Sequence, residues 1–305
     1  REARRLGARC RILGRAPRMR TMKYQSKAPF PTTGMMQTLE AVCLERSGAC
    51  LAEKCQVAVE DAVSIDIEGV GVYTLMCTPT DAIPLAVGFA LTEGIIRVVE
   101  DIASISECMD SFGVIRLVLK DPSTLNLGGR NLIVNSSCGL CGSTETVEAL
   151  LSNIPPVGTT RSASLDAALA AIEIMRDSQR LFQHTGGAHA AALFSPSATL
   201  VALAEDVGRH NALDKAIGKC LLGAVPTAGC MATLSGRLSL EMVVKAARAG
   251  VEIIVAVSAV SSLAIRAAEQ LNVTICGFAR ESRMTVFTHA ERILGAVGSA
   301  TRGAD

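Results

Sequence analysis

Two cysteines spaced three residues apart form the strongest chemical signal in the sequence. The stretch "SSCGLCGSTE" contains Cys138 and Cys141, and each is followed directly by a glycine. Helix-forming residues begin near Ser143. A cysteine just ahead of a helix N-terminus has its thiolate stabilised by the helix dipole and by free N–H groups. The glycines let the backbone turn sharply and leave the sulfur atoms uncovered. The pair is therefore a candidate nucleophilic, redox or metal-binding centre.

The loop alone leaves several kinds of site open. A structural zinc site needs four ligands, and the sequence has no second Cys-x-x-Cys pair. A deaminase zinc site has His-x-Glu ahead of Pro-Cys-x-x-Cys, but here no His-x-Glu precedes the pair and Ser137 replaces the proline. A thioredoxin-like pair lies near the start of a small domain, whereas this one lies mid-chain. Beside these metal and redox alternatives, the loop is compatible with a purely structural pair and with a sulfur carrier, in which one thiolate attacks a sulfur donor and holds a persulfide.

Four glycine-containing stretches gather charged and His residues at the ends of expected elements. They are "HTGGAHAA" (184–191), "EDVGRHNALDK" (205–215), "SGRLSLEMVVK" (235–245) and "GFARESRMTVFTH" (277–289). In an open α/β sheet, ligands bind at the carboxyl ends of strands. The second stretch ends a strand with Glu205 and Asp206, and places Arg209 and His210 beside a helix N-terminus that could hold a phosphate. Each stretch alone is compatible with a solvated loop, but together they predict a site for a large anionic ligand with phosphates and a base.

Hydrophobic periodicity indicates the elements that must position these groups. Residues 57–79 alternate apolar and polar side chains in two runs, which predicts a pair of strands, and a helix is expected over 84–93. Unbroken apolar strands then alternate with helices toward the C-terminus, which implies a buried sheet covered on both faces. The fold class is therefore α/β. Further expected elements are strands at 112–120, 130–137 and 273–279, helices at 144–152 and 165–183, and a helix capped by Asn211.

The charge is unevenly distributed along the 305 residues. Residues 1–23 contain eight Arg and one Lys against one Glu, a local net charge of +8. The whole chain has +1, so the remaining residues have −7, which argues against nucleic-acid binding by the body. No apolar run approaches the roughly 18–20 residues that a membrane span needs. Most of the eleven cysteines sit in apolar runs, which favours a reducing, cytoplasmic location.

Three regions follow from these patterns. Residues 1–50 are expected to form a basic, disordered arm and a lead-in. Residues 51–125 are expected to form a smaller, strand-rich N-terminal domain, and residues 126–305 a larger α/β domain with the cysteine loop and the ligand site.

Several motifs in one order resemble the FdhD/NarQ family of formate dehydrogenase accessory sulfurtransferases. The resemblance runs from about Val57 to Arg292 and includes "GFALTEGII" (88–96), the cysteine loop, and all four stretches above. It implies an enzyme that accepts persulfide sulfur from a cysteine desulfurase and passes it to the molybdenum cofactor, molybdopterin guanine dinucleotide, for a formate dehydrogenase catalytic subunit. It also implies a homodimer and a larger domain of cytidine-deaminase-like fold, with a mixed sheet flanked by helices and no intrinsic metal.

The resemblance also assigns roles to residues. It implies that Cys138 holds the persulfide and that Cys141 assists or shares the sulfur. The segment assigned to cofactor contact corresponds to Phe278, Ala279, Arg280, Glu281, Ser282 and Arg283. From the residues themselves, His189, Arg209 and His210 are additional candidates, and the two His residues are candidates for proton handling. A cofactor-delivering chaperone with structural cysteines is the main alternative, and a zinc-dependent deaminase is a third.

Overall fold

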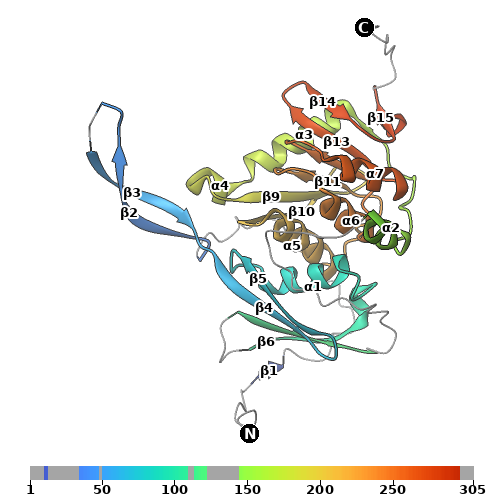
Figure 1. The fold of residues 1–305 in the computed structure, drawn as a ribbon, viewed down its shortest axis with the longest axis horizontal. Coiled ribbons are helices and arrows are strands. Elements are labelled where there is room, and N and C mark those ends of the chain that lie inside the picture. Colours follow the sequence, from blue (N-terminus) through green and yellow to red (C-terminus); the bar gives the residue numbers. More distant parts are fainter. Residues whose placement is uncertain (1–9, 13–33, 48–49, 109–112, 122–143, 296–305) are drawn as a thin grey trace.

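The computed structural model describes residues 10–12, 34–47, 50–108, 113–121 and 144–295, and Figure 1 shows their arrangement. Its two larger sheets, of six and five strands, form separate layers with helices between them. None of the described helices combines the length and the apolar character needed to cross a membrane.

The sheet closer to the C-terminus has six strands in the order β10-β9-β11-β12-β13-β14. Its three central strands, β11 to β13, run parallel, and α6 and α7 connect them. The flanking strands β9, β10 and β14 pair with their neighbours in the antiparallel direction. The strands are β9 (His189–Phe194), β10 (Leu200–Asp206), β11 (Met231–Leu234), β12 (Ile253–Ala256), β13 (Thr274–Arg280) and β14 (Arg283–Val286).

Helices cover both faces of this sheet, as the continuous apolar strands predict. On one face lies α3 (Leu165–Asp177), which packs against a buried cluster that includes Phe194, Met231 and Val255. The other face is covered by α5 (Arg209–Leu222), α6 (Leu240–Arg248) and α7 (Ser262–Gln270).

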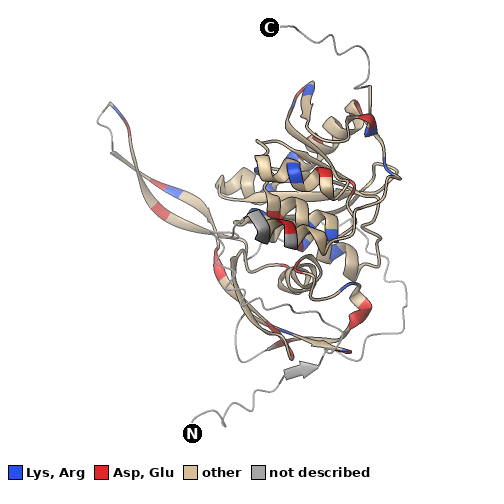
Figure 2. Cartoon of the chain, turned by 45° about the vertical axis from the view of Figure 1, so that its right-hand side comes forward, with Lys and Arg blue, Asp and Glu red and all other residues tan. Residues whose placement is uncertain are grey.

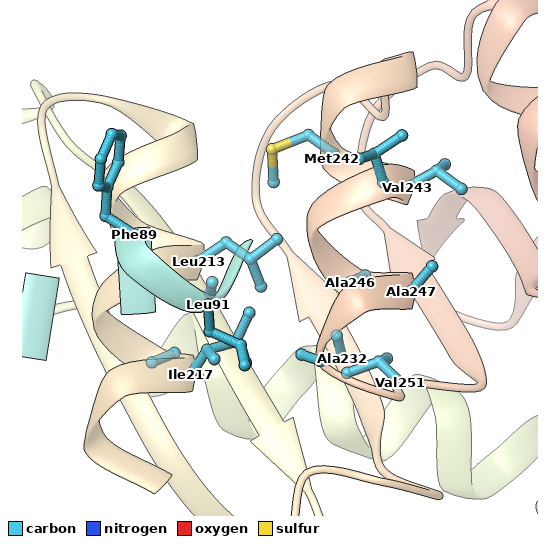
Figure 3. Close-up of a cluster of buried hydrophobic side chains, with 14 of the residues drawn as sticks. Phe89, Leu91, Leu213, Ile217, Ala232, Met242, Val243, Ala246, Ala247 and Val251 are labelled. Carbon is cyan, nitrogen blue, oxygen red and sulfur yellow. The ribbon is translucent and has the colours of Figure 1, made fainter. Parts of the chain in front are cut away.

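A five-stranded sheet of order β1-β6-β7-β4-β5 lies beyond these helices, with α1 (Ala82–Thr92) between it and α5. One buried cluster runs through all of these layers, from Ile65 and Leu117 on this sheet to Ala232 on the other. Figure 3 shows part of it, where side chains of α1, α5 and α6 meet. The strands are β1 (Cys10–Ile12), β4 (Asp61–Ile67), β5 (Gly71–Cys77), β6 (Ile102–Cys108) and β7 (Val114–Leu119).

A long two-stranded hairpin projects away from both sheets (Figure 1). It consists of β2 (Met36–Leu44) and β3 (Cys50–Ala58), and no strand was expected before residue 57. Its base packs against Leu181 and Ala188. Minor elements complete the described chain: α2 (Thr144–Ser152), α4 (Arg180–Thr185), β8 (Ala163–Ser164), β15 (Ile293–Leu294) and short 3-10 helices at Val99–Asp101 and Ala290–Arg292.

Two expectations about element boundaries were wrong. The helix expected over 165–183 is two helices, α3 and α4, and Ser164 caps the first. Gly208, rather than Asn211, is the N-cap of α5. The strand expected over 273–279 is confirmed as β13, and a further strand, β14, follows it where the chain turns back at Glu281.

Candidate functional site

Most predicted site residues gather at one edge of the six-stranded sheet. The parallel strands β11, β12 and β13 all end at this edge. Because β9 runs antiparallel to β11, its first residue, His189, lies at the same edge. His189 is also paired with Asp206, the last residue of β10, and α5 begins three residues later. The residues predicted at the carboxyl ends of strands therefore do lie along one edge of the sheet. We call this edge, where β11, β12 and β13 end and β9 begins, the carboxyl edge.

His189 and Arg209 approach each other over a glycine. A Cβ atom on Gly236 would lie 3.2 Å from His189 Nδ1 and 3.5 Å from Arg209 Cβ, so glycine keeps the space between them open. His189 Nδ1 lies 3.4 Å from the hydroxyl of Ser235, which also accepts a hydrogen bond from the N–H of Ala190. Burial, followed by the charges of Arg209 and His210, lowers the pKa of His189. His189 is therefore held as a neutral imidazole near pH 7.

His210 lies beside a carboxylate that the sequence analysis did not include in the site. Its Nε2 is 2.8 Å from Oε2 of Glu241, in the first turn of α6. The ring of His210, as a hydrogen-bond partner and as a nearby charge, lowers the pKa of Glu241. The signal available in the sequence was the spacing of Glu241 and Lys245, which predicts a pair within the helix. Lys245 instead pairs with Asp214 and Glu93, and Glu241 is left for His210.

Glu205 has a structural role and is not available to a ligand. Its two carboxylate oxygens accept hydrogen bonds from the N–H groups of Leu181 and Phe182, at 2.8 and 2.9 Å. These N–H groups belong to the first turn of α4, so Glu205 caps the helix that restarts after the break. Burial nevertheless raises the pKa of Glu205.

Asp206 is likewise committed to internal contacts. Its Oδ1 accepts hydrogen bonds from the Gly208 N–H and the Asn211 amide, at 2.7 and 3.1 Å. Its Oδ2 lies 2.6 Å from Nζ of Lys215, and both side chains are fully buried. The same oxygen accepts from the N–H of Thr78, which follows β5 of the other sheet. Asp206 thus fixes the turn that carries Arg209 and His210 instead of contacting a ligand itself.

The predicted cofactor-contact segment forms the tip of the β13–β14 hairpin and the bulge before it. Phe278 has φ 54°, its ring is 44% exposed, and its N–H donates to the carbonyl of Ser258 after β12. Its ring also lies 6.4 Å from that of Phe287. Ala279 faces the other way and is buried in the cluster under α3, so its side chain cannot reach a ligand.

The tip of this hairpin is strained and positively charged. Arg280 lies opposite Arg283 in the strand register, and Glu281 between them has φ 48°. All three side chains and that of Ser282 are exposed. Like charges directly opposite each other destabilise a strand pair, and non-glycine residues with positive φ are typically retained at functional sites. Figure 2 shows that Lys, Arg, Asp and Glu positions are spread along the described chain, including its helices and the β2–β3 hairpin.

The structure brings His189, Arg209 and His210 together but sets the hairpin apart from them. Strands β11 and β12 separate β9 from β13, so three strand spacings, about 14 Å, lie between the two groups along the carboxyl edge. Cys138 and Cys141 lie outside the described residues, as does the strand expected over 130–137. Among the residues that are described, no group of three His, Cys, Asp or Glu side chains is placed to hold a metal ion.

Comparisons with known proteins agree with the resemblance. The model of the FdhD/NarQ family matches residues 58–294. The chain is 39% identical over 254 residues to sulfur carrier protein FdhD of Anaeromyxobacter dehalogenans, a match that covers 78% of this chain and 88% of that protein. It is 38% identical over 263 residues to sulfur carrier protein FdhD of Mycolicibacterium paratuberculosis, covering 81% and 95%.

A solved structure has the same fold. It is a crystal structure of a protein described as a candidate formate dehydrogenase accessory protein from Desulfotalea psychrophila. The two structures superpose with a TM-score of 0.68 at 25% identity, over 85% of this chain and 100% of the other. With the family model spanning both sheets and the carboxyl edge, this chain belongs to the FdhD/NarQ family.

Proposed function

We propose that this protein is a sulfur carrier in the maturation of formate dehydrogenase. The thiolate of Cys138 attacks the persulfide of a cysteine desulfurase, the desulfurase thiol leaves, and Cys138 retains the terminal sulfur. Cys141 assists or shares that sulfur. The S–S bond of this persulfide then breaks: the outer sulfur passes to the molybdenum cofactor, which the protein holds as cargo before a formate dehydrogenase receives it, and Cys138 leaves as its thiolate.

The observation that carries the proposal is the combination of family and sequence: relatives 38–39% identical to the chain are named sulfur carriers, and the chain has the Cys-x-x-Cys pair that such chemistry needs. The mechanism requires an attacking thiolate, and a second thiol nearby lets the sulfur be shared or released. The cysteines buried in the described core do not suit this role, because burial raises the pKa of Cys77, Cys220 and Cys276 to about 12.

The carboxyl edge supports a place for the cargo. Molybdopterin guanine dinucleotide carries phosphates and a purine, so it needs cations and a flat apolar surface. Arg280 and Arg283 supply cations, and the exposed ring of Phe278 supplies the surface. At the other end of the edge, Arg209 offers a buried Nε that has no hydrogen-bond partner among the described residues. A ligand of dinucleotide size is long enough to span the roughly 14 Å between them.

The finer predictions about the molecule belong to the same proposal. They are a cytoplasmic homodimer, a larger domain of cytidine-deaminase-like fold, and the division at residues 50 and 125. The partners are a cysteine desulfurase and a formate dehydrogenase catalytic subunit.

Persulfide mapping tests the function directly. The protein is incubated with a cysteine desulfurase and cysteine, and its intact mass and modified peptides are measured. We expect a reducible gain of at least one sulfur atom on the 136–145 peptide, abolished by Cys138→Ala. Guanosine diphosphate, the nucleotide part of the cargo, should bind more weakly to an Arg280→Ala, Arg283→Ala variant in calorimetry.

The alternative, a cofactor-delivering chaperone with structural cysteines, predicts a different result. With an active desulfurase, that protein would gain no sulfur on the 136–145 peptide. Its Cys138→Ala variant would still restore formate dehydrogenase activity in a strain that lacks the protein. Loss of labelling only in Cys141→Ala would retain the mechanism and exchange the roles of the two cysteines.

A further inference from the structure

A carboxylate at the carboxyl edge has no obvious place in an anion site. Glu241 lies there, at the start of α6, and its negative charge does not suit a ligand rich in phosphates. Since a bare carboxylate would repel such a ligand, the side chain that Glu241 contacts indicates what it does.

Glu241 contacts His210 and not the cation on its own helix. Its Oε2 is 2.8 Å from His210 Nε2, while Lys245 lies one turn further along α6. Lys245 Nζ is bound 2.8 Å from Asp214 and 2.9 Å from Glu93. The imidazole is therefore the closest partner of the Glu241 carboxylate, while the charges of Arg209 and then Lys245 make smaller contributions that also lower the pKa of Glu241.

The contact joins the first turns of two helices. His210 is the second residue of α5 and Glu241 the second residue of α6, so the pair links the two helix N-termini at the carboxyl edge. Both side chains are partly exposed, at 23% and 31%, so the ring is held and yet accessible. With Nε2 engaged by Glu241, Nδ1 is the ring nitrogen left for a ligand or a proton.

We propose that Glu241 is a positioning residue. It fixes the imidazole of His210 beside Arg209 at the carboxyl edge, so that Nδ1 of that ring is available to contact the cargo. The proposal rests on the proposed function, because the cargo is the one named there. Glu241 acts only through His210 and does not itself contact the ligand. A carboxylate that orients an imidazole through one nitrogen sets the direction and role of the other.

A double-mutant cycle tests this coupling. Wild type, Glu241→Ala, Glu241→Gln, His210→Ala and the Glu241→Ala, His210→Ala double variant are titrated with guanosine diphosphate by calorimetry. We expect Glu241→Ala to weaken binding about tenfold, and the double variant to bind no more weakly than His210→Ala, as residues acting through one contact are non-additive. Glu241→Gln should stay within about threefold of wild type, because its amide oxygen can take the place of the carboxylate oxygen that lies 2.8 Å from Nε2.

The chain offers a matched control in a second His–Glu pair. His289 Nδ1 lies 3.8 Å from Glu291, near the opposite edge of the sheet, where Thr274 begins β13. Glu291→Ala should bind the nucleotide like wild type. Urea unfolding of every variant separates lost positioning from lost stability.

The outcomes distinguish this inference from the proposed function. Persulfide loading on the 136–145 peptide should be unchanged in all Glu241 variants. If wild type loads sulfur and Glu241→Ala binds the nucleotide normally, or if the two single effects add, the positioning role is wrong and the carrier function stands. If wild type takes up no sulfur, the function itself fails, whatever the Glu241 variants do.

Discussion

At the scale of single residues, His189 gives the clearest pH dependence. Its pKa lies below the ordinary value of 6.5, first because the ring is buried and then because Arg209 and His210 lie nearby. Between 6.5 and the folded-state pKa, the unfolded chain binds a proton that the folded chain does not. Stability from this group is therefore fully present above about pH 6.5 and is lost as the pH falls through the folded-state pKa.

We predict that His189→Gln reduces the loss of stability at acid pH. The free energy of unfolding in urea, measured from about pH 7.5 to about pH 5, should fall less steeply for the variant than for wild type. His184→Gln, on an exposed residue of α4, is the control and should follow wild type. A variant curve parallel to that of wild type would show that His189 does not titrate as its surroundings require.

Residue types and local spacing predicted which cations and imidazoles lie at the carboxyl edge, but not the contacts of the acidic residues there. Arg209 and His210 could be placed from the sequence because they follow a strand and lie beside an expected helix N-terminus. The roles of Glu205 and Asp206 depend on Leu181 and Thr78, which are distant in the sequence. The contact of Glu241 could not be predicted from the sequence. The i, i+4 rule pairs it with Lys245 on the same helix, whereas its actual partner, His210, lies on another helix.

At the scale of elements, the interiors of strands and helices followed from periodicity and the boundaries did not. Strand pair β4–β5 and helices α1 and α2 lie where the pattern predicts them. The break between α3 and α4 has no glycine or proline to announce it, and it depends on the carboxylate of Glu205. Asn211 is a preferred N-cap residue, yet here its amide donates to Asp206 and to the carbonyl of Met76.

Helices α1 and α5 cross with their backbones in close contact. A Cβ on Gly218 of α5 would lie 1.9 Å from the carbonyl oxygen of Pro84, and one on Gly88 of α1 would lie 1.8 Å from that of Asp214. These distances are far below any real contact, so the two helices can meet this closely only through their glycines.

Gly218→Ala should therefore destabilise the protein, although alanine favours a helix by about 1 kcal/mol over glycine. Forcing a methyl group between packed backbones costs about 1–3 kcal/mol or more, since the obstacle is main chain and not a flexible side chain. Thermal unfolding should show a lower Tm. Gly187→Ala, where the nearest atoms are at an ordinary 3.8 Å, is the control, and a Gly218→Ala variant as stable as wild type would contradict the close crossing.

At the scale of the whole molecule, buried charges join the two sheets. Lys215 of α5 contacts Asp206 and donates to the carbonyl of Thr78 at 2.7 Å, which connects the end of β10 to the segment after β5. The core is also continuous across the layers. We therefore expect the five-stranded and six-stranded sheets to unfold together, and not as independent units.

Lys215→Met tests the clamp between the sheets. Removing the cation leaves the fully buried carboxylate of Asp206 with neutral donors alone, which costs about 3–5 kcal/mol of unfolding free energy. Adding Asp206→Asn should recover part of this loss, because no buried charge then remains unpaired. Urea unfolding of the three proteins measures both effects. Since Asp206 also fixes the turn before Arg209, Lys215→Met should bind guanosine diphosphate more weakly as well. An unchanged free energy of unfolding in Lys215→Met would show that the pair does not hold the sheets together.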